Sequence, residues 1–74
     1  MSEKIEIEVR DLPDPFDIRV YRVGDGLELD MYDAYIVPHP GDQLLLHYDR
    51  PVVVRSRQFH ALYEDRIHLY VEEL

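Results

Sequence analysis

The sequence has 74 residues and a mass of 8.9 kDa, which is the size of one small domain. It carries sixteen Asp and Glu residues against eight Lys and Arg residues, a net charge of −8. This balance argues against binding to nucleic acids or anionic membranes, because both attract basic side chains. The sequence contains no Cys, which excludes disulfides, thiolate nucleophiles and cysteine-ligated zinc.

Alternating apolar and charged residues predict the first strand over residues 4–10. Ile5, Ile7 and Val9 fall on one side of this strand and charged residues on the other, which is typical of a strand with one buried face. Two prolines within residues 11–15 end it, because proline removes an N–H donor from a sheet and fixes φ. We expect no signal peptide, since the chain does not start with a basic segment followed by an apolar one.

Residues 17–31 are predicted to form a β-hairpin. Gly24 and Gly26 flank an aspartate at its centre, and glycine adopts the positive φ of tight turns at no steric cost. The next segment, residues 33–37, fits either a short strand or an irregular link. Prolines and a glycine within residues 38–42 then break the pattern.

The second half of the chain predicts three more strands. They span residues 43–48, 52–59 and 66–73, with a tight connection at 49–51 and a turn at 60–65. Little or no helix is expected. Five to seven short strands in a single domain over residues 1–74 predict an all-β fold, a small antiparallel meander rolled into a barrel or a two-layer sandwich. Closure of this kind removes exposed sheet edges.

The last three strands are predicted to have two different faces. We place Val53 opposite Leu46 and Arg57 opposite His68. One face is then mainly apolar and is expected in the core: Leu45, Val52, Val54, Ser56, Ile67, Leu69 and Val71. The other face mixes aromatic, basic and apolar residues: Leu44, Leu46, Tyr48, Arg55, Arg57, Phe59, His68, Tyr70 and Glu72.

The mixed face supplies the candidate functional residues. Tyr, Arg and Phe are enriched at protein interfaces, so we predict an interaction face made of Tyr48, Arg55, Arg57, Phe59, His68 and Tyr70. The alternative is that the N-terminal strands cover this face as a second packed layer. The arginines favour a partly exposed face over a covered one, because burying an unpaired guanidinium is costly.

Metal binding and catalysis have little support in the sequence. The predicted register separates the histidines (His39, His47, His60 and His68), whereas zinc needs three or four converging ligands. The carboxylates of the proline loop, at Asp11, Asp14 and Asp17, are expected to splay apart. Serine occurs only at two positions, threonine is absent, and three glycines cannot form a phosphate-binding loop. We therefore expect no enzyme activity, no cofactor and no metal.

A Gly-Asp turn, a strand, a tight turn and two longer strands follow one another between Val37 and Glu73. Their sequences are Pro40-Gly41-Asp42, Leu44-Leu45-Leu46, Val52-Val53-Val54 with Arg57-Gln58-Phe59, and Ile67-His68-Leu69-Tyr70-Val71-Glu72. This half of the chain resembles short bacterial proteins of the SH3-like small β-barrel type. The resemblance implies a barrel and, at most, a binding role.

These features predict a small soluble, cytoplasmic, non-catalytic interaction module. It would bind a protein partner or a second copy of itself through the face of the last three strands. The alternative is an acidic inhibitor or nucleic-acid mimic that occupies a basic site through residues 3–33, because the first 33 residues hold ten of the sixteen acidic residues. Mimicry would weaken steeply with salt, and an aromatic interface would not.

Overall fold

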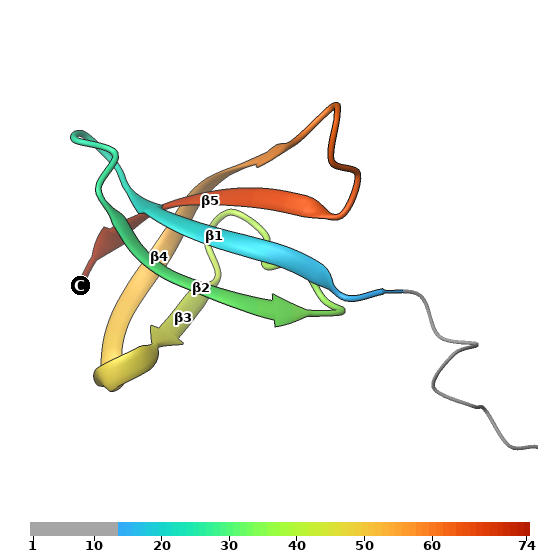
Figure 1. The fold of residues 1–74 in the computed structure, drawn as a ribbon. Helices are drawn as coiled ribbons and strands as arrows, with labels where there is room; N and C mark the ends of the chain where they lie inside the picture. Colours follow the sequence, from blue (N-terminus) through green and yellow to red (C-terminus); the bar gives the residue numbers. More distant parts are fainter. Residues whose placement is uncertain (1–13) are drawn as a thin grey trace, which may run out of the picture.

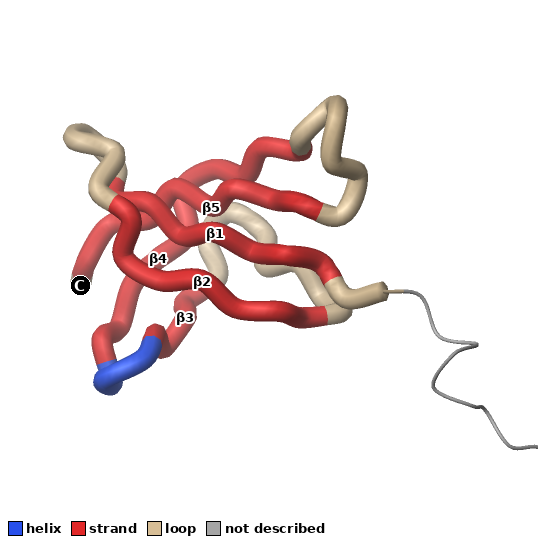
Figure 2. Tube along the Cα trace, viewed as in Figure 1, coloured by secondary structure: helices blue, strands red, loops and turns tan. Residues whose placement is uncertain are grey.

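The computed structural model describes residues 14–74, so the strand predicted over residues 4–10 lies outside the described residues. Five strands make up one sheet (Figure 1): β1 (Phe16–Arg22), β2 (Glu28–Ala34), β3 (Gln43–Leu46), β4 (Arg50–Phe59) and β5 (Arg66–Glu73). The one helical element in this part of the chain is a single 3-10 turn, His47–Asp49, between β3 and β4 (Figure 2). The all-β prediction is confirmed.

The strand order is β2-β1-β5-β4-β3, and the sheet curls into a half-barrel (Figure 1). The β1–β2, β3–β4 and β4–β5 pairs are antiparallel, as a meander requires. The β1–β5 pair is parallel, with Ile18 opposite Ile67 and Val20 opposite Leu69. This pair joins the first and the last strand of the described chain. Alternation within a strand predicts which face is buried, but it does not predict whether two strands pair parallel or antiparallel.

The concave side of the curled sheet holds the core. Seven side chains there have no exposed surface: Ile18 and Val20 from β1, Val52 and Val54 from β4, and Ile67, Leu69 and Val71 from β5. They are the alternate residues of three adjacent central strands, so they meet on one face. The aliphatic residues predicted for this face are confirmed, apart from Leu45.

The predicted hairpin is confirmed as β1 and β2. Its turn contains Gly24 at φ 102° and Gly26 at φ 72°, values that favour glycine over every other residue. The link after it is irregular, since β2 ends at Ala34 and residues 35–42 form no strand. Gly41, at φ 95°, returns the chain to the sheet, where its N–H donates to the carbonyl of Val54 at 2.8 Å.

A β-bulge in β4 changes the predicted register of its second half. Up to Val54 the pairing with β5 is the one expected, with Val54 opposite Val71, but it shifts by one residue between Val54 and Ser56. Arg57 therefore lies opposite Leu69 and not His68, so that prediction was wrong. A bulge places two residues of one strand against one of its partner, which inverts the faces beyond it.

The predicted register of β3 was also wrong. Leu46 lies opposite Arg50, and Gln43 lies opposite Val53. Leu46 is accordingly buried at 5% exposure, whereas Leu45, assigned to the core from the sequence, is 67% exposed. The strand stops at Leu46 because Tyr48 and Asp49 both adopt positive φ, as the primed turns of hairpins require. The turn therefore comes earlier in the chain than the alternation predicted.

Candidate functional site

The six residues of the predicted interaction face do not lie on one surface. His68 and Tyr70 project from the convex side of β5, and Arg55 joins them there through a 2.6 Å ion pair with Glu72. Beyond the bulge, Arg57 and Phe59 lie opposite the core residues Leu69 and Ile67, so they belong to the concave side. Tyr48 lies in the β3–β4 turn, at the other end of the sheet.

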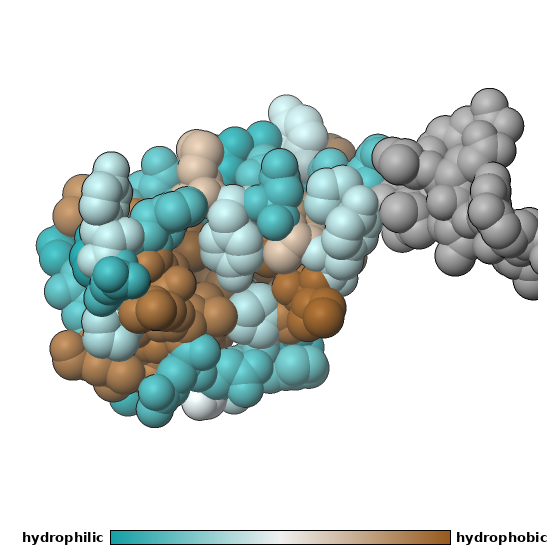
Figure 3. Space-filling view, turned by 90° about the horizontal axis from the view of Figure 1, so that it is seen from below, coloured by the Kyte–Doolittle hydropathy of each residue, from teal (hydrophilic) through white to brown (hydrophobic). Residues whose placement is uncertain are grey.

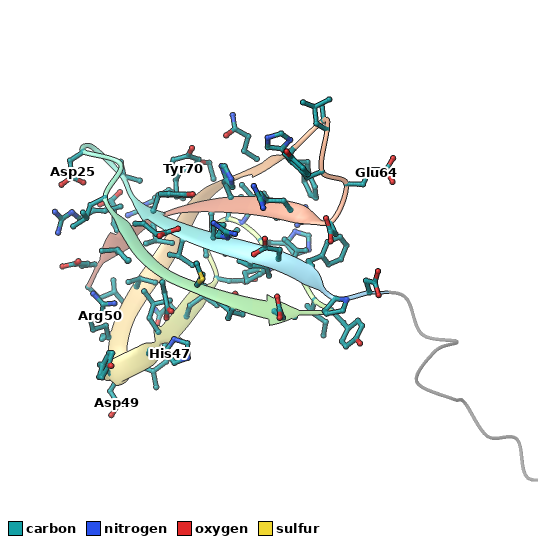
Figure 4. The ribbon with its side chains drawn as sticks, in the orientation of Figure 1. Asp25, His47, Asp49, Arg50, Glu64 and Tyr70 are labelled. Carbon is teal, nitrogen blue, oxygen red and sulfur yellow. The ribbon has the colours of Figure 1, made fainter. Side chains whose placement is uncertain are left out.

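The guanidinium of Arg57 lies over the Phe59 ring, with its carbon 5.5 Å from the ring centroid. The structure therefore keeps these two residues together on the concave side, away from Tyr70, although Phe59 at the end of β4 still lines a hollow with His68. Figure 4 shows Tyr70 above the sheet, with His47 and Asp49 of the β3–β4 turn below it. The bulge at Arg55 is the physical cause of the split.

A row of rings, here called the aromatic row, occupies the convex side. Its members are Tyr63, His60, His68, Tyr21 and Tyr70. The Tyr21 ring lies 5.0 Å from the His68 ring and 5.7 Å from the Tyr70 ring, centroid to centroid. The parallel β1–β5 pairing produces this contact, because it sets Tyr21 opposite Tyr70. Alternation within one strand cannot assign this neighbour, because the pairing joins two segments far apart in the sequence.

The β4–β5 connection supplies the other end of the aromatic row. His60 lies 4.8 Å from Tyr63 and 6.2 Å from His68 between ring centroids. Its Nδ1 accepts hydrogen bonds from the backbone N–H groups of Leu62 and Tyr63 at 3.1 and 3.3 Å. His60 and His68, predicted to lie apart, are therefore neighbours. A hollow of about 340 Å³ opens beside them, lined also by Gln58, Phe59 and Ala61.

Charged residues flank the aromatic row. The Asp17 carboxylate accepts hydrogen bonds from Arg19 at 3.0 Å and from Arg66 at 3.3 Å, and the Arg66 guanidinium also covers the Tyr63 ring at 4.7 Å. The Arg19 hydrogen bond is the main cause that lowers the pKa of Asp17. Burial, followed by the nearby His60, lowers the pKa of His68. His68 is therefore favoured in its neutral form.

A second surface lies at the open side of the half-barrel, where the edge strands β2 and β3 face each other. We call it the seam groove. It has a volume of about 480 Å³ and is lined by Asp30, Tyr32, Leu44, Leu45, Leu46, His47, Tyr48 and Asp49. Apolar side chains gather on this underside of the molecule, between hydrophilic ones (Figure 3). A sequence pattern does not predict this groove, because the groove depends on where two edge strands meet.

Side chains bridge one end of the seam groove. Asp30, whose side chain is 9% exposed, accepts a hydrogen bond from the His47 N–H at 2.8 Å and contacts the His47 Nδ1 at 2.6 Å. Burial would raise the pKa of Asp30, but these bonds and one from the Met31 N–H outweigh it and lower the pKa. Arg50 donates to the carbonyl of Leu29 at 2.6 Å.

No group of three or more His, Asp or Glu residues in residues 14–74 is arranged to hold a metal ion. Over the same residues, no helix is long and apolar enough to cross a membrane.

The comparisons with known proteins add no assignment. No protein-family model, no curated protein and no solved structure matches this chain.

Proposed function

We propose that the chain is a non-catalytic protein-interaction module, located in the cytoplasm, that binds a protein partner or a second copy of itself through the aromatic row. The observation that carries this proposal is the contact of Tyr21 with His68 and Tyr70 across the parallel strand pair. Clustered tyrosines beside arginines are the composition that dominates the binding energy of protein interfaces. A nucleic-acid partner is disfavoured by the net charge of −8.

The preorganisation of the row supports the same proposal. The rings of Tyr21, His68 and Tyr70 pack against one another on the paired strands β1 and β5, so these side chains have little entropy left to lose when a partner binds. Arg19 and Arg66, held by Asp17, would form a polar rim around the rings. An aromatic centre with a charged rim is the usual arrangement of such interfaces.

Truncating Tyr70 tests the proposal. Tyr70→Ala should weaken self-association or partner capture by about thirtyfold or more, equivalent to roughly 2 kcal/mol. Self-association is measured by sedimentation velocity, and partner capture by quantitative pull-down from the native host. Tyr35→Ala is the matched control, because Tyr35 is an exposed tyrosine outside the row. Arg57→Ala is a second control, since Arg57 lies on the concave side.

Equal binding by Tyr70→Ala and Tyr35→Ala, with both proteins folded in urea titrations, would reject the aromatic row as the interface.

The alternative function, an acidic mimic acting through residues 3–33, is favoured only by the acidic excess of that segment. In its described part, four carboxylates have partners within the chain: Asp17 with Arg19 and Arg66, Asp25 with Arg22 at 2.6 Å, Glu28 with Arg19 at 3.9 Å, and Asp30 with His47. Carboxylates paired in this way present less charge to a basic site. A binding constant that falls steeply with ionic strength would favour the mimic over the module.

The SH3-like type of barrel is also part of the proposal. The short strands and the curl of the sheet support it. The parallel β1–β5 pair departs from the antiparallel meander that the sequence predicts. An experimentally determined structure, compared strand by strand with known SH3-like barrels, would decide.

A further inference from the structure

We infer that the seam groove is the docking site of the chain's own residues 4–10, which precede the described residues. The segment would lie along the edge of β3 as a sixth strand, antiparallel to β3, with its apolar face over the groove. This surface is separate from the aromatic row, so the inference does not depend on the function proposed for that row.

The edge of β3 that faces the seam has backbone groups without a strand partner. The direction of backbone groups alternates along a strand, and the N–H of His47, just after β3, points across the seam to β2. The groups of Gln43 and Leu45 are in step with His47 and point the same way. The carbonyl of Asp42 is out of step and accepts from Val54 of β4. Since β3 pairs only with β4 in the described sheet, Gln43 and Leu45 are open to a further strand.

The opposite edge, on β2, is already in use at one end of the groove. The Leu29 carbonyl accepts from Arg50 at 2.6 Å, and the Met31 N–H donates to the Asp30 carboxylate at 2.8 Å. The same carboxylate accepts from His47, which bridges the two edges. The segment would therefore pair with β3 and end at this bridge.

The groove opens toward the end of the sheet where the segment joins the fold. Phe16, the first residue of β1, pairs with Ala34, the last residue of β2, and Tyr32 of the groove lies close to that end. The connection, residues 11–15, reaches about 17 Å when extended. Crossing β2 requires two strand spacings, or about 10 Å. The connection is therefore long enough for the segment to reach the groove.

The direction of the segment suits pairing with β3. β1 is parallel to β5, and β5 and β3 are each antiparallel to β4, so β3 follows the direction of β1 around the sheet. A chain that turns back before β1 runs opposite to β1. It would therefore meet β3 as an antiparallel neighbour, the pairing that β3 also makes with β4.

The segment has an apolar face of the kind that the groove can cover. Alternation places Ile5, Ile7 and Val9 on one face of the predicted strand. In the groove, Tyr32 from β2 and Leu44 from β3 are half-buried and pack against the core. Figure 3 shows apolar surface on this underside. Docking would remove apolar surface from water on both the segment and the groove, which favours the contact.

Charge at the bridged end fits the start of the segment. Arg50 brings a guanidinium to the seam, and its Nε is buried without an acceptor among the described residues. Glu3 falls on the same face as Ile5, and the antiparallel arrangement places it toward this end of the groove. Its carboxylate would supply the acceptor that a buried donor requires.

Amide hydrogen exchange of the full chain tests the inference. Docking would give the Leu45 N–H a hydrogen-bond acceptor on the segment. We therefore expect it to exchange at least about tenfold more slowly, after correction for intrinsic rates, than the N–H of Ile36, a loop residue that is 81% exposed. Contacts between the methyl groups of Ile7 and Leu44 in nuclear Overhauser spectra would identify the neighbour directly.

A pair of double variants separates the two faces of the segment. Ile5→Gln combined with Ile7→Gln removes the apolar face, so the Leu45 N–H should exchange at least about tenfold faster than in the unchanged chain. Glu6→Gln combined with Glu8→Gln is the matched control, because it introduces the same residue on the opposite face. This control should change the exchange rate by less than about twofold.

The centre of the sheet reports whether each variant is folded. The N–H of Leu69, a completely buried residue of β5, should remain protected in both double variants. If the isoleucine double variant also loses protection at Leu69, the single change Ile7→Gln removes less apolar surface and provides the comparison at Leu45.

Three results would overturn the inference. Exchange of Leu45 as fast as that of Ile36 in the unchanged chain would show that the β3 edge is open to water. Protection that survives Ile5→Gln with Ile7→Gln would show that another group covers the edge. Protection that rises with protein concentration, together with self-association in sedimentation velocity, would make a second copy the occupant. None of these results bears on the aromatic row, which Tyr70→Ala tests.

Discussion

The centre and the margin of this sheet are held by different forces. At the centre, β1, β5 and β4 have a strand on each side, and seven aliphatic side chains are completely buried between them. At the margin, where β2 faces β3, a few hydrogen bonds cross the seam: the Asp30 carboxylate accepts from His47, and Arg50 donates to the Leu29 carbonyl. The Nε of Arg50 is buried there without a hydrogen-bond partner among the described residues.

This difference assigns stability to the centre of the sheet and binding to its margin. Burial of aliphatic surface stabilises the central strands whatever the partner does, because it is roughly proportional to area and needs no particular geometry. Hydrogen bonds across the seam contribute less net free energy and leave leucine and tyrosine surface exposed. The margin can therefore change its contacts without unfolding the centre, which is the property that a docking site needs.

The largest expected effect comes from a leucine at the centre. Leu69→Ala should lower the free energy of unfolding by about 2 to 5 kcal/mol, since Leu69 is completely buried and the alanine would leave a cavity. Leu45→Ala, the same change at the margin, should alter it by no more than about 0.5 kcal/mol, because Leu45 is 67% exposed. Urea titrations of the two variants measure both values.

Similar losses from both leucine variants would contradict the division into a stable centre and a weakly held margin.

Much of the centre could be predicted from the sequence. Alternation identified Ile67, Leu69 and Val71 as one buried face, since a strand with one face against a core must repeat every second residue. The hairpin followed from its glycines in the same way. Both are properties of residues close together in the chain, which is the range over which sequence patterns carry structural information.

The candidate sites could not be predicted, because they depend on contacts between distant residues. Tyr21 meets Tyr70 only through the parallel pairing of β1 with β5. One extra residue at the bulge places Arg57 on the opposite face of the sheet from His68. Nothing in the sequence of β4 marks the position of the bulge. The seam groove exists because the sheet curls, which brings its two edge strands close to each other.

An intermediate effect is expected at the seam. Asp30→Asn should lower the free energy of unfolding at pH 7 by about 1 to 2 kcal/mol, since a largely buried carboxylate loses charged hydrogen bonds. Because folding lowers the pKa of Asp30, its contribution is present above the pKa of the unfolded chain, near 3.9. It is lost as the pH falls through the folded pKa.

The matched control is Asp25→Asn, at the exposed end of the β1–β2 hairpin. Hydrogen bonds from Arg22 and from the Leu27 N–H lower the pKa of Asp25 to about 2, but water screens this exposed pair. Asp25→Asn should therefore cost less stability at pH 7 than Asp30→Asn. Urea titrations at pH 7 and at pH 2 compare the two, and a larger loss from Asp25→Asn would show that the seam bonds do not hold the margin.

The smallest effect is expected on the convex side, at His68. Burial and the neighbouring His60 lower the pKa of His68 below its usual 6.5, so the unfolded chain binds a proton there more readily than the folded chain. Stability should therefore be constant above about pH 6.5 and fall as the pH drops toward the folded pKa, with no further loss from this group below it. His68→Gln should flatten this part of the profile without changing the acid dependence due to Asp30. Chemical denaturation between pH 5 and pH 8 measures the profile, and the His68 ring resonances give its pKa directly. A folded pKa above 6.5 would reverse the sign of the dependence, and it would mean that attraction by Asp17 outweighs the burial produced by packing against Tyr21.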